Sequence, residues 1–217
     1  MLSGEHAREE PPVDGGRWPV SVVFLPDPRA GARLDDVSHQ AAGIAGAGHW
    51  RSGALGFSHV TVRALEHHRQ HIDDDDAAVG RYAQAVRAAA RRCGPVQLHL
   101  NGLTLAPGSV MACAQPVDRQ ADRFRTVLAE ELGPDGWREA ELPPRDIWYV
   151  TLLHFAADIP DPERLVAWVD QHRELDLGPV TLDWVALVRF IHVEEPTLGM
   201  RPTVLAAVLL DGPAPLA

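Results

Sequence analysis

The 217-residue sequence contains no lysine, so arginine supplies all 20 of its basic residues. This absence excludes chemistries that need a lysine amine. The chain has no phosphate-loop lysine, no Schiff-base lysine and no lysine that could carry a covalent nucleotide, as ATP-dependent ligases use. The bias toward Ala, Arg, Gly and Pro suggests a bacterial genome rich in G and C.

Cysteine and long apolar runs are also scarce. The two cysteines, Cys93 and Cys113, lack metal-type spacing, which predicts reduced thiols in a cytoplasmic protein. No apolar run is long enough to span a bilayer, and the N-terminus lacks the apolar core of a secretory signal, so we expect no membrane partner. We predict a disordered leader over residues 1–16 and a single two-lobed domain over 17–217. The sequence is silent on oligomeric state.

The net charge of −10 disfavours a protein that wraps nucleic acid, because phosphate contacts require a basic surface. A chain of this charge that handles phosphates would do so locally, with a few arginines and hydroxyl groups in a pocket. The charge therefore favours a small phosphorylated partner over long RNA.

The stretch Gly56–Leu65 ("GFSHVTVRAL") alternates polar and apolar residues. In a strand, His59, Thr61 and Arg63 would share one face, while the Val, Val and Ala between them would face a core. The polar face combines a titratable base, a hydroxyl and a guanidinium, which suits an anion. An ordinary solvent-exposed strand face is the other interpretation.

Periodicity and turn residues divide the chain into two halves of similar element order: helix, strand, helix, strand, strand. The strand after the first helix reads His59-Val60-Thr61 in one half and Tyr149-Val150-Thr151 in the other. Strands are expected at 19–25, 59–65, 96–105, 108–116, 145–155, 180–193 and 201–210, and helices at 34–45, 77–94, 118–133 and 161–172. If the halves face each other, the two x-Val-Thr strands would meet across a cleft.

This arrangement resembles the two-histidine phosphoesterase superfamily, which includes bacterial 2′-5′ RNA ligase-like proteins and cyclic phosphodiesterases. The resemblance covers about Pro19 to Leu210. It implies an α+β fold of two pseudo-symmetric lobes, each an antiparallel sheet backed by helices, around a central cleft. It also implies two H-x-T/S motifs, one in each lobe, and His59 and Thr61 match the first.

The second motif departs from that pattern. Thr151 keeps the hydroxyl position, but Tyr149 stands where the second histidine belongs. His154 follows three residues later and would point to the opposite face unless a bulge re-aims it. His99, on the polar face of its strand, is the other candidate replacement. A core strand with satisfied Tyr and His side chains is the alternative interpretation.

The resemblance implies a phosphodiesterase-type hydrolase that needs no metal or cofactor and acts on a cyclic nucleotide or an RNA-terminal phosphate. Histidine suits proton transfer near neutral pH, whereas a phenol with a pKa near 10 is a poor base. We therefore assign His59 as general base, Tyr149 as donor to the substrate, and Thr61 and Thr151 as phosphate ligands. Arg63 could neutralise charge on the substrate.

Two other functions remain open from the sequence. Loss of one imidazole is also what a non-catalytic nucleotide- or phosphate-binding protein with a degenerate site would show. A metal-dependent hydrolase could use His67 and His71, four residues apart, with an aspartate of the run Asp73–Asp76. That acidic run also precedes a helix, where it would cap the first turn.

Overall fold

The structure, a computed structural model, describes residues 6–142 and 147–212. The strands are β1 (Ser21–Phe24), β2 (Val60–Ala64), β3 (Val96–Ala106), β4 (Ser109–Pro116), β5 (Trp148–His154), β6 (Asp176–Leu182), β7 (Trp184–Val193) and β8 (Gly199–Leu209). The helices are α1 (Pro28–Ala45), α2 (Ala77–Ala90), α3 (Gln120–Leu132) and α4 (Pro162–Gln171), and the 3₁₀ helix η1 covers Gly133–Glu141. No helix in these ranges is long and apolar enough to cross a membrane.

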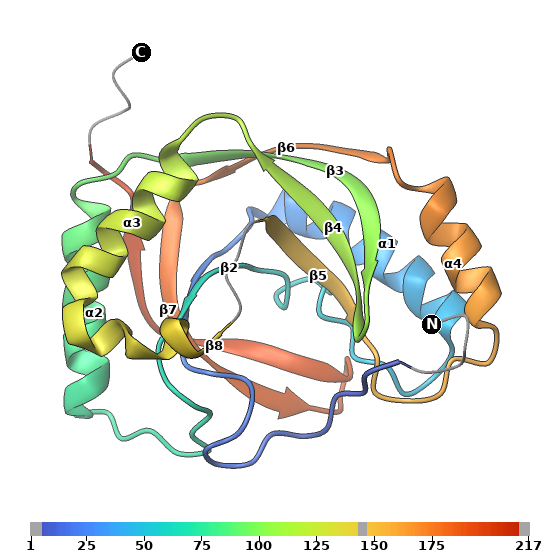
Figure 1. The fold of residues 1–217 in the computed structure, drawn as a ribbon, viewed down its shortest axis with the longest axis horizontal. Coiled ribbons are helices and arrows are strands. Elements are labelled where there is room, and N and C mark those ends of the chain that lie inside the picture. Colours follow the sequence, from blue (N-terminus) through green and yellow to red (C-terminus); the bar gives the residue numbers. More distant parts are fainter. Residues whose placement is uncertain (1–5, 143–146, 213–217) are drawn as a thin grey trace.

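The strands form one antiparallel sheet with the order β6-β3-β4-β5-β2-β1-β7-β8. Helices α1 and α4 pack beside β3, β5 and β6, while α2 packs beside β7 and β8 with α3 against it (Figure 1). The α+β class and the two helix-backed lobes are therefore confirmed. The two half-sheets are joined through one residue pair, Val60 with Val150.

The sheet is strongly curled. Only Asp183 separates β6 from β7 along the chain, yet β6 lies at one end of the strand order and β7 next to the other end. Such neighbours in sequence can lie at opposite ends of the order only if the sheet curves back on itself. The sequence predicted one strand over 180–193. The chain instead changes pairing partner at Asp183, from β3 to β1.

Apolar alternation and capping residues explain the local structure. In β2 the Val60 and Val62 side chains are buried, and Thr61 between them is half-buried. Asp76 caps α2, because its carboxylate accepts a hydrogen bond from Val79 N at 3.0 Å. The predicted capping role of the acidic run is thus confirmed at its last residue.

Residues 6–16 differ from the disordered leader that the sequence predicted. Ala7 N donates to Pro107 O at 2.8 Å, and Glu9 N donates to Phe155 O at 2.7 Å. The Glu9 side chain is buried in spite of its charge. Composition alone missed this segment because its contacts are made by backbone groups and by polar or charged side chains, among them the ion pair of Arg8 with Asp158, and not by an apolar stripe.

Candidate active site

Strands β2 and β5 lie side by side at the centre of the sheet (Figure 1). Val60 pairs with Val150 in antiparallel register, and both side chains point into the core. The residues on either side of this pair therefore project from the opposite face. There the register places His59 beside Thr151, and Thr61 beside Tyr149. The two x-Val-Thr segments are neighbours in one sheet, not strands facing each other across a cleft.

Each of these two strands carries a β-bulge directly after its threonine. In β2, Val22 pairs with Arg63 but Val23 pairs with Thr61, so Val62 is the extra residue. In β5, Val110 pairs with Leu153 and Met111 with Thr151, so Leu152 is the extra residue. The two halves thus share a structural irregularity at equivalent positions, which supports the internal repeat inferred from element order.

The bulge in β5 changes where His154 points. Leu152 and Leu153 are both fully buried, so the simple alternation of the strand ends after Thr151. The residue after them, His154, returns to the face of Tyr149 and Thr151 and lines the same cavity. Of the two candidate replacement histidines, His154 is the one that reaches this face.

Buried hydrogen bonds hold the bulge in place. The Leu152 carbonyl accepts from Ser38 Oγ and from Gly53 N, each at 2.8 Å. Trp50 exchanges two backbone hydrogen bonds with His154, at 3.0 and 2.9 Å. Ser38 comes from α1, and the Trp50–Gly53 loop follows that helix. The orientation of the His154 side chain therefore depends on residues that lie far from it in the sequence.

The His154 imidazole is enclosed on several sides. Its Nδ1 lies 2.6 Å from Ser52 Oγ, and the Trp18 ring packs edge-on against it with centroids 4.9 Å apart. Burial lowers the pKa of His154 to about 3, with smaller contributions from the positive charges of Arg17 and His59. His154 is therefore neutral at physiological pH while the site holds no anion.

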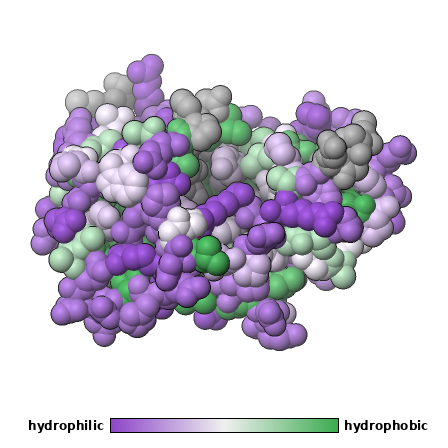
Figure 2. Space-filling model, turned by 60° about the horizontal axis from the view of Figure 1, so that its bottom comes forward, coloured by the Kyte–Doolittle hydropathy of each residue, from purple (hydrophilic) through white to green (hydrophobic). Residues whose placement is uncertain are grey.

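One cavity of about 780 Å³ collects the side chains of both strands. His59, Thr61, Tyr149, Thr151 and His154 all line it. A volume of this size accommodates a nucleotide-sized ligand. Hydrophilic residues cover most of the molecular face in Figure 2, with hydrophobic residues only scattered among them.

His59 is oriented by its own loop. Its Nδ1 donates a hydrogen bond to Phe57 O at 2.9 Å, because a carbonyl oxygen can only accept. In the neutral ring this places the lone pair on Nε2, the nitrogen that a general base uses. The ring also packs against Phe190, with centroids 4.9 Å apart.

Arg63 does not line the cavity, although the sequence predicted it as a substrate ligand. Its Nη2 donates instead to Gly136 O in η1 at 2.9 Å. The alternation that the prediction assumed is present, since buried and half-buried side chains alternate from Val60 to Ala64, but the Arg63 guanidinium is held by η1 and does not reach the cavity.

His99 also lies outside the cavity. Its Nε2 pairs with Asp176 Oδ1 at 2.8 Å, across from β3 to β6 at the sheet edge. The polar face of β3 is genuine, but two strands, β4 and β5, separate β3 from β2.

Two arginines that the sequence did not single out line the cavity, Arg17 just before β1 and Arg138 in η1. No periodic signal marks either of them, since both come from segments without regular alternation. His67 lines the cavity as well, and its ring lies 5.7 Å from that of Trp137.

The metal-site alternative finds no support in the described part of the chain. His71 Nε2 pairs with Asp73 Oδ1 at 2.9 Å, and His67 lies at the cavity. Within residues 6–142 and 147–212, no group of three or more His, Cys, Asp or Glu side chains gathers as a metal ion requires.

Comparison with known proteins identifies the fold. No family model matches the sequence, and no curated protein matches it. Among solved structures, TT0787 of Thermus thermophilus superposes with a TM-score of 0.64 at 18% identity, covering 89% of this chain and 98% of that one. E. coli LigT complexed with 3′-AMP superposes with a TM-score of 0.59 at 14% identity, over 89% and 98% of the two chains.

A third structure, described as a phosphoesterase, gives a TM-score of 0.56 at 13% identity over 88% of this chain and 97% of its own. The chain therefore has the fold of LigT. The resemblance inferred from the motifs is confirmed at the level of the fold.

Proposed function

We propose that this protein is a phosphodiesterase of the 2′-5′ RNA ligase-like type that acts on a cyclic nucleotide or an RNA-terminal phosphate in the cytoplasm. The observation that carries the proposal is the meeting of His59, Thr61, Tyr149, Thr151 and His154 in one cavity. Its fold neighbours include LigT bound to 3′-AMP and a protein described as a phosphoesterase.

In the proposed reaction His59 acts as general base. With its Nδ1 proton donated to Phe57 O, its Nε2 takes a proton from a water molecule. The water oxygen forms a bond to phosphorus, and the bond from phosphorus to the ribose 2′ oxygen breaks. Thr61 and Thr151, which flank the Val60–Val150 pair, hydrogen-bond the non-bridging oxygens.

The leaving oxygen needs a proton from the other side of the phosphorus. His154 supplies it in our proposal as the imidazolium ion, which forms because the negative charge of the bound phosphate favours protonation of this buried imidazole. Tyr149 donates a hydrogen bond from its hydroxyl group to the phosphate. Every step uses side chains of the protein, without a metal or organic cofactor.

The test is hydrolysis of 2′,3′-cyclic nucleotides by the wild type and His59→Ala. A general-base role predicts a loss in kcat of about a hundredfold or more. His99→Ala is the matched control, because it removes an imidazole outside the cavity, and its activity is expected to equal that of the wild type. An unchanged rate in His59→Ala would remove His59 from the mechanism.

The alternative function is a non-catalytic binder of nucleotides or phosphate. Tyr149 at the position of the second histidine favours it, since a phenol does not replace an imidazole as an acid–base group. This alternative predicts measurable affinity for adenosine 3′-monophosphate by calorimetry, with no hydrolysis of cyclic nucleotides between about pH 5 and 9. Any turnover that disappears in His59→Ala rejects it.

A further inference from the structure

We propose that Arg17 and Arg138 form a second anion subsite in this cavity, and that it binds a second phosphate group of the substrate. The inference rests on the proposed function, in which the first phosphate lies over β2 and β5. It names the substrate class more narrowly: a nucleotide that carries another phosphate besides the one that reacts.

The charge of the cavity is opposite to that of the chain. The protein has a net charge of −10, yet two arginines and three histidines line the cavity. Within the ranges that the structure describes, no Asp or Glu lines it. A cavity lined by arginine side chains and, among the described residues, by no carboxylate creates a local potential that attracts an anion, even on a chain of net negative charge.

A buried carboxylate holds Arg17 at the cavity. Arg17 Nη1 pairs with Glu9 Oε1 at 2.7 Å, where the Glu9 side chain is 4% exposed and that of Arg17 is 69% exposed. The other carboxylate oxygen of Glu9 accepts from Trp18 Nε1 at 3.2 Å. Burial raises the pKa of Glu9, which means that keeping this carboxylate ionised next to Arg17 reduces the stability of the folded protein.

The backbone at this point is strained. Trp18 has φ = 72°, which is a rare conformation for a bulky residue. Such strain concentrates at functional sites, where the surrounding structure enforces it. Here it accompanies two consecutive side chains that both line the cavity, the Arg17 guanidinium and the Trp18 indole.

Arg138 approaches from η1. Its Nη1 pairs with Glu141 Oε2 at 2.9 Å, and its side chain is only 16% exposed. Its buried Nε has no hydrogen-bond partner among the described residues. Because Arg138 lines the cavity, its guanidinium can offer charge-assisted hydrogen bonds to a phosphate oxygen.

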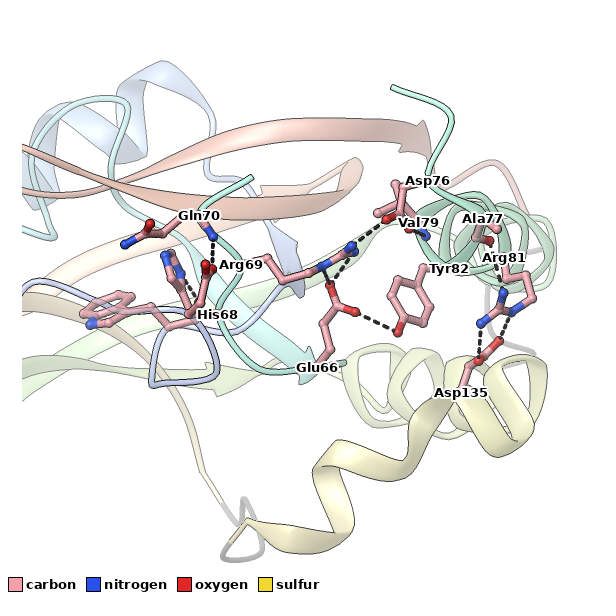
Figure 3. A network of polar contacts seen from close by, with 12 residues as sticks. Glu66, His68, Arg69, Gln70, Asp76, Ala77, Val79, Arg81, Tyr82 and Asp135 are labelled. Atoms are coloured by element: carbon pink, nitrogen blue, oxygen red, sulfur yellow. Dashed lines mark hydrogen bonds and ion pairs between the residues drawn. The ribbon is translucent and has the colours of Figure 1, made fainter. Parts of the chain in front are cut away.

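Polar contacts fix both segments relative to the sheet. Arg69 pairs with Glu66 and with Asp76, and Tyr82 donates to Glu66, which ties the loop after β2 to α2 (Figure 3). The same loop holds the segment before β1, because His68 Nδ1 donates to Trp18 O at 3.0 Å.

Two further hydrogen bonds tie η1 to α2. Arg81 donates to both carboxylate oxygens of Asp135, at 2.8 and 3.0 Å (Figure 3). Arg138, three residues after Asp135, is thus carried on an anchored segment. Both arginines therefore lie on segments that hydrogen bonds hold in place, which limits the conformational entropy lost when they bind an anion.

The two arginines come from other segments of the chain than the groups that hold the first phosphate. His59, Thr61, Tyr149 and Thr151 all project from β2, β5 or the residue before β2, whereas Arg17 and Arg138 come from outside the sheet. A cavity of about 780 Å³ can hold both groups of a bisphosphorylated nucleotide at once.

The experiment compares two substrates: adenosine 2′,3′-cyclic phosphate, and the same compound with a 5′-phosphate. We expect the wild type to show a kcat/KM about tenfold or more higher for the second compound, as one charge-assisted hydrogen-bonded contact provides. Arg17→Gln and Arg138→Gln should each reduce this preference severalfold, and Glu9→Gln should reduce it partially. Arg173→Gln, an exposed arginine away from the cavity, should leave it unchanged.

A parallel calorimetric titration uses adenosine 3′-monophosphate and adenosine 3′,5′-bisphosphate, and its result does not depend on turnover. Tighter binding of the bisphosphate that weakens in Arg17→Gln supports the subsite even if no hydrolysis occurs. Hydrolysis with equal kcat/KM for both cyclic substrates, or equal affinity for both ligands, overturns the subsite while leaving the proposed function intact.

Discussion

The buried imidazole of His154 makes the stability of this protein depend on pH in a way that can be calculated. Its pKa is about 3 in the folded protein, against a reference value of 6.5. The unfolded chain therefore binds the proton more readily than the folded protein does. The stabilising contribution is complete above pH 6.5 and is lost progressively as the pH falls from 6.5 toward 3.

The magnitude follows from that window. A pH of 5 lies about 1.5 units below the pKa of 6.5 that the imidazole has in the unfolded chain. Each unit is worth about 1.4 kcal/mol, so the free energy of unfolding falls by about 2 kcal/mol between pH 7.5 and pH 5. His154→Gln cannot titrate and lacks this loss. Urea unfolding of both proteins at the two pH values should show the stability difference between them shifting by about 2 kcal/mol.

The contributions of the other titrating groups to the pH dependence of stability cancel in this comparison. Glu9 also has a shifted pKa, but it is present in both proteins. His39→Gln is the control, because His39 lies on the exposed side of α1 and its replacement should leave the pH dependence of stability unchanged. If the difference between wild type and His154→Gln stays the same at both pH values, His154 is not desolvated as described here.

Three further predictions concern the support of the site. Ser52→Ala leaves Nδ1 of His154 without its partner and should cost about 1–3 kcal/mol in urea unfolding, with recovery in Ser52→Thr. Gly53→Ala places a Cβ 3.0 Å from the backbone of β5, so it should lower the free energy of unfolding by about 1–3 kcal/mol and weaken nucleotide binding. An affinity equal to that of the wild type would argue against a role of the Gly53 contact in positioning His154. Asp76→Ala should lower stability by about 0.5–2 kcal/mol through loss of the α2 cap, while Asp74→Ala, the matched control, should not.

Local patterns in the sequence were sufficient to predict most elements. The alternation around Thr61 predicted β2, and Asp161 followed by Pro162 predicted the start of α4. The start of α1 was predicted too late, near residue 34. The helix begins earlier, at Pro28, with Asp27 as its N-cap.

The bulges could not be predicted from the sequence. Two adjacent leucines, such as Leu152 and Leu153, fit a bulge but also fit a strand buried on both faces, so the sequence does not show which residue is the extra one. The bulge in β5 is held by Ser38 and Gly53, more than ninety residues earlier in the chain by their numbering. For this reason the sequence placed His99 on a polar strand face and His154 on the opposite face unless a bulge intervened, and only tertiary contacts show that His154 reaches the cavity.

The position of the second imidazole determines when it can act. A histidine at the surface is partly protonated near neutral pH before any ligand arrives. His154 is buried and lies within reach of the positive charge of Arg17, so it is neutral in the empty site. A bound phosphate brings negative charge to the same cavity, which favours the imidazolium form and opposes both effects.

Phosphate binding should therefore be accompanied by uptake of a proton at His154. Calorimetric titration of adenosine 3′-monophosphate at pH 7 in two buffers of different ionisation enthalpy measures this uptake directly. The wild type should give buffer-dependent heats, and His154→Gln should lose most of that dependence. Equal heats in the two buffers for the wild type would mean that His154 stays neutral with phosphate bound, and Tyr149 would then be the remaining donor to the leaving oxygen.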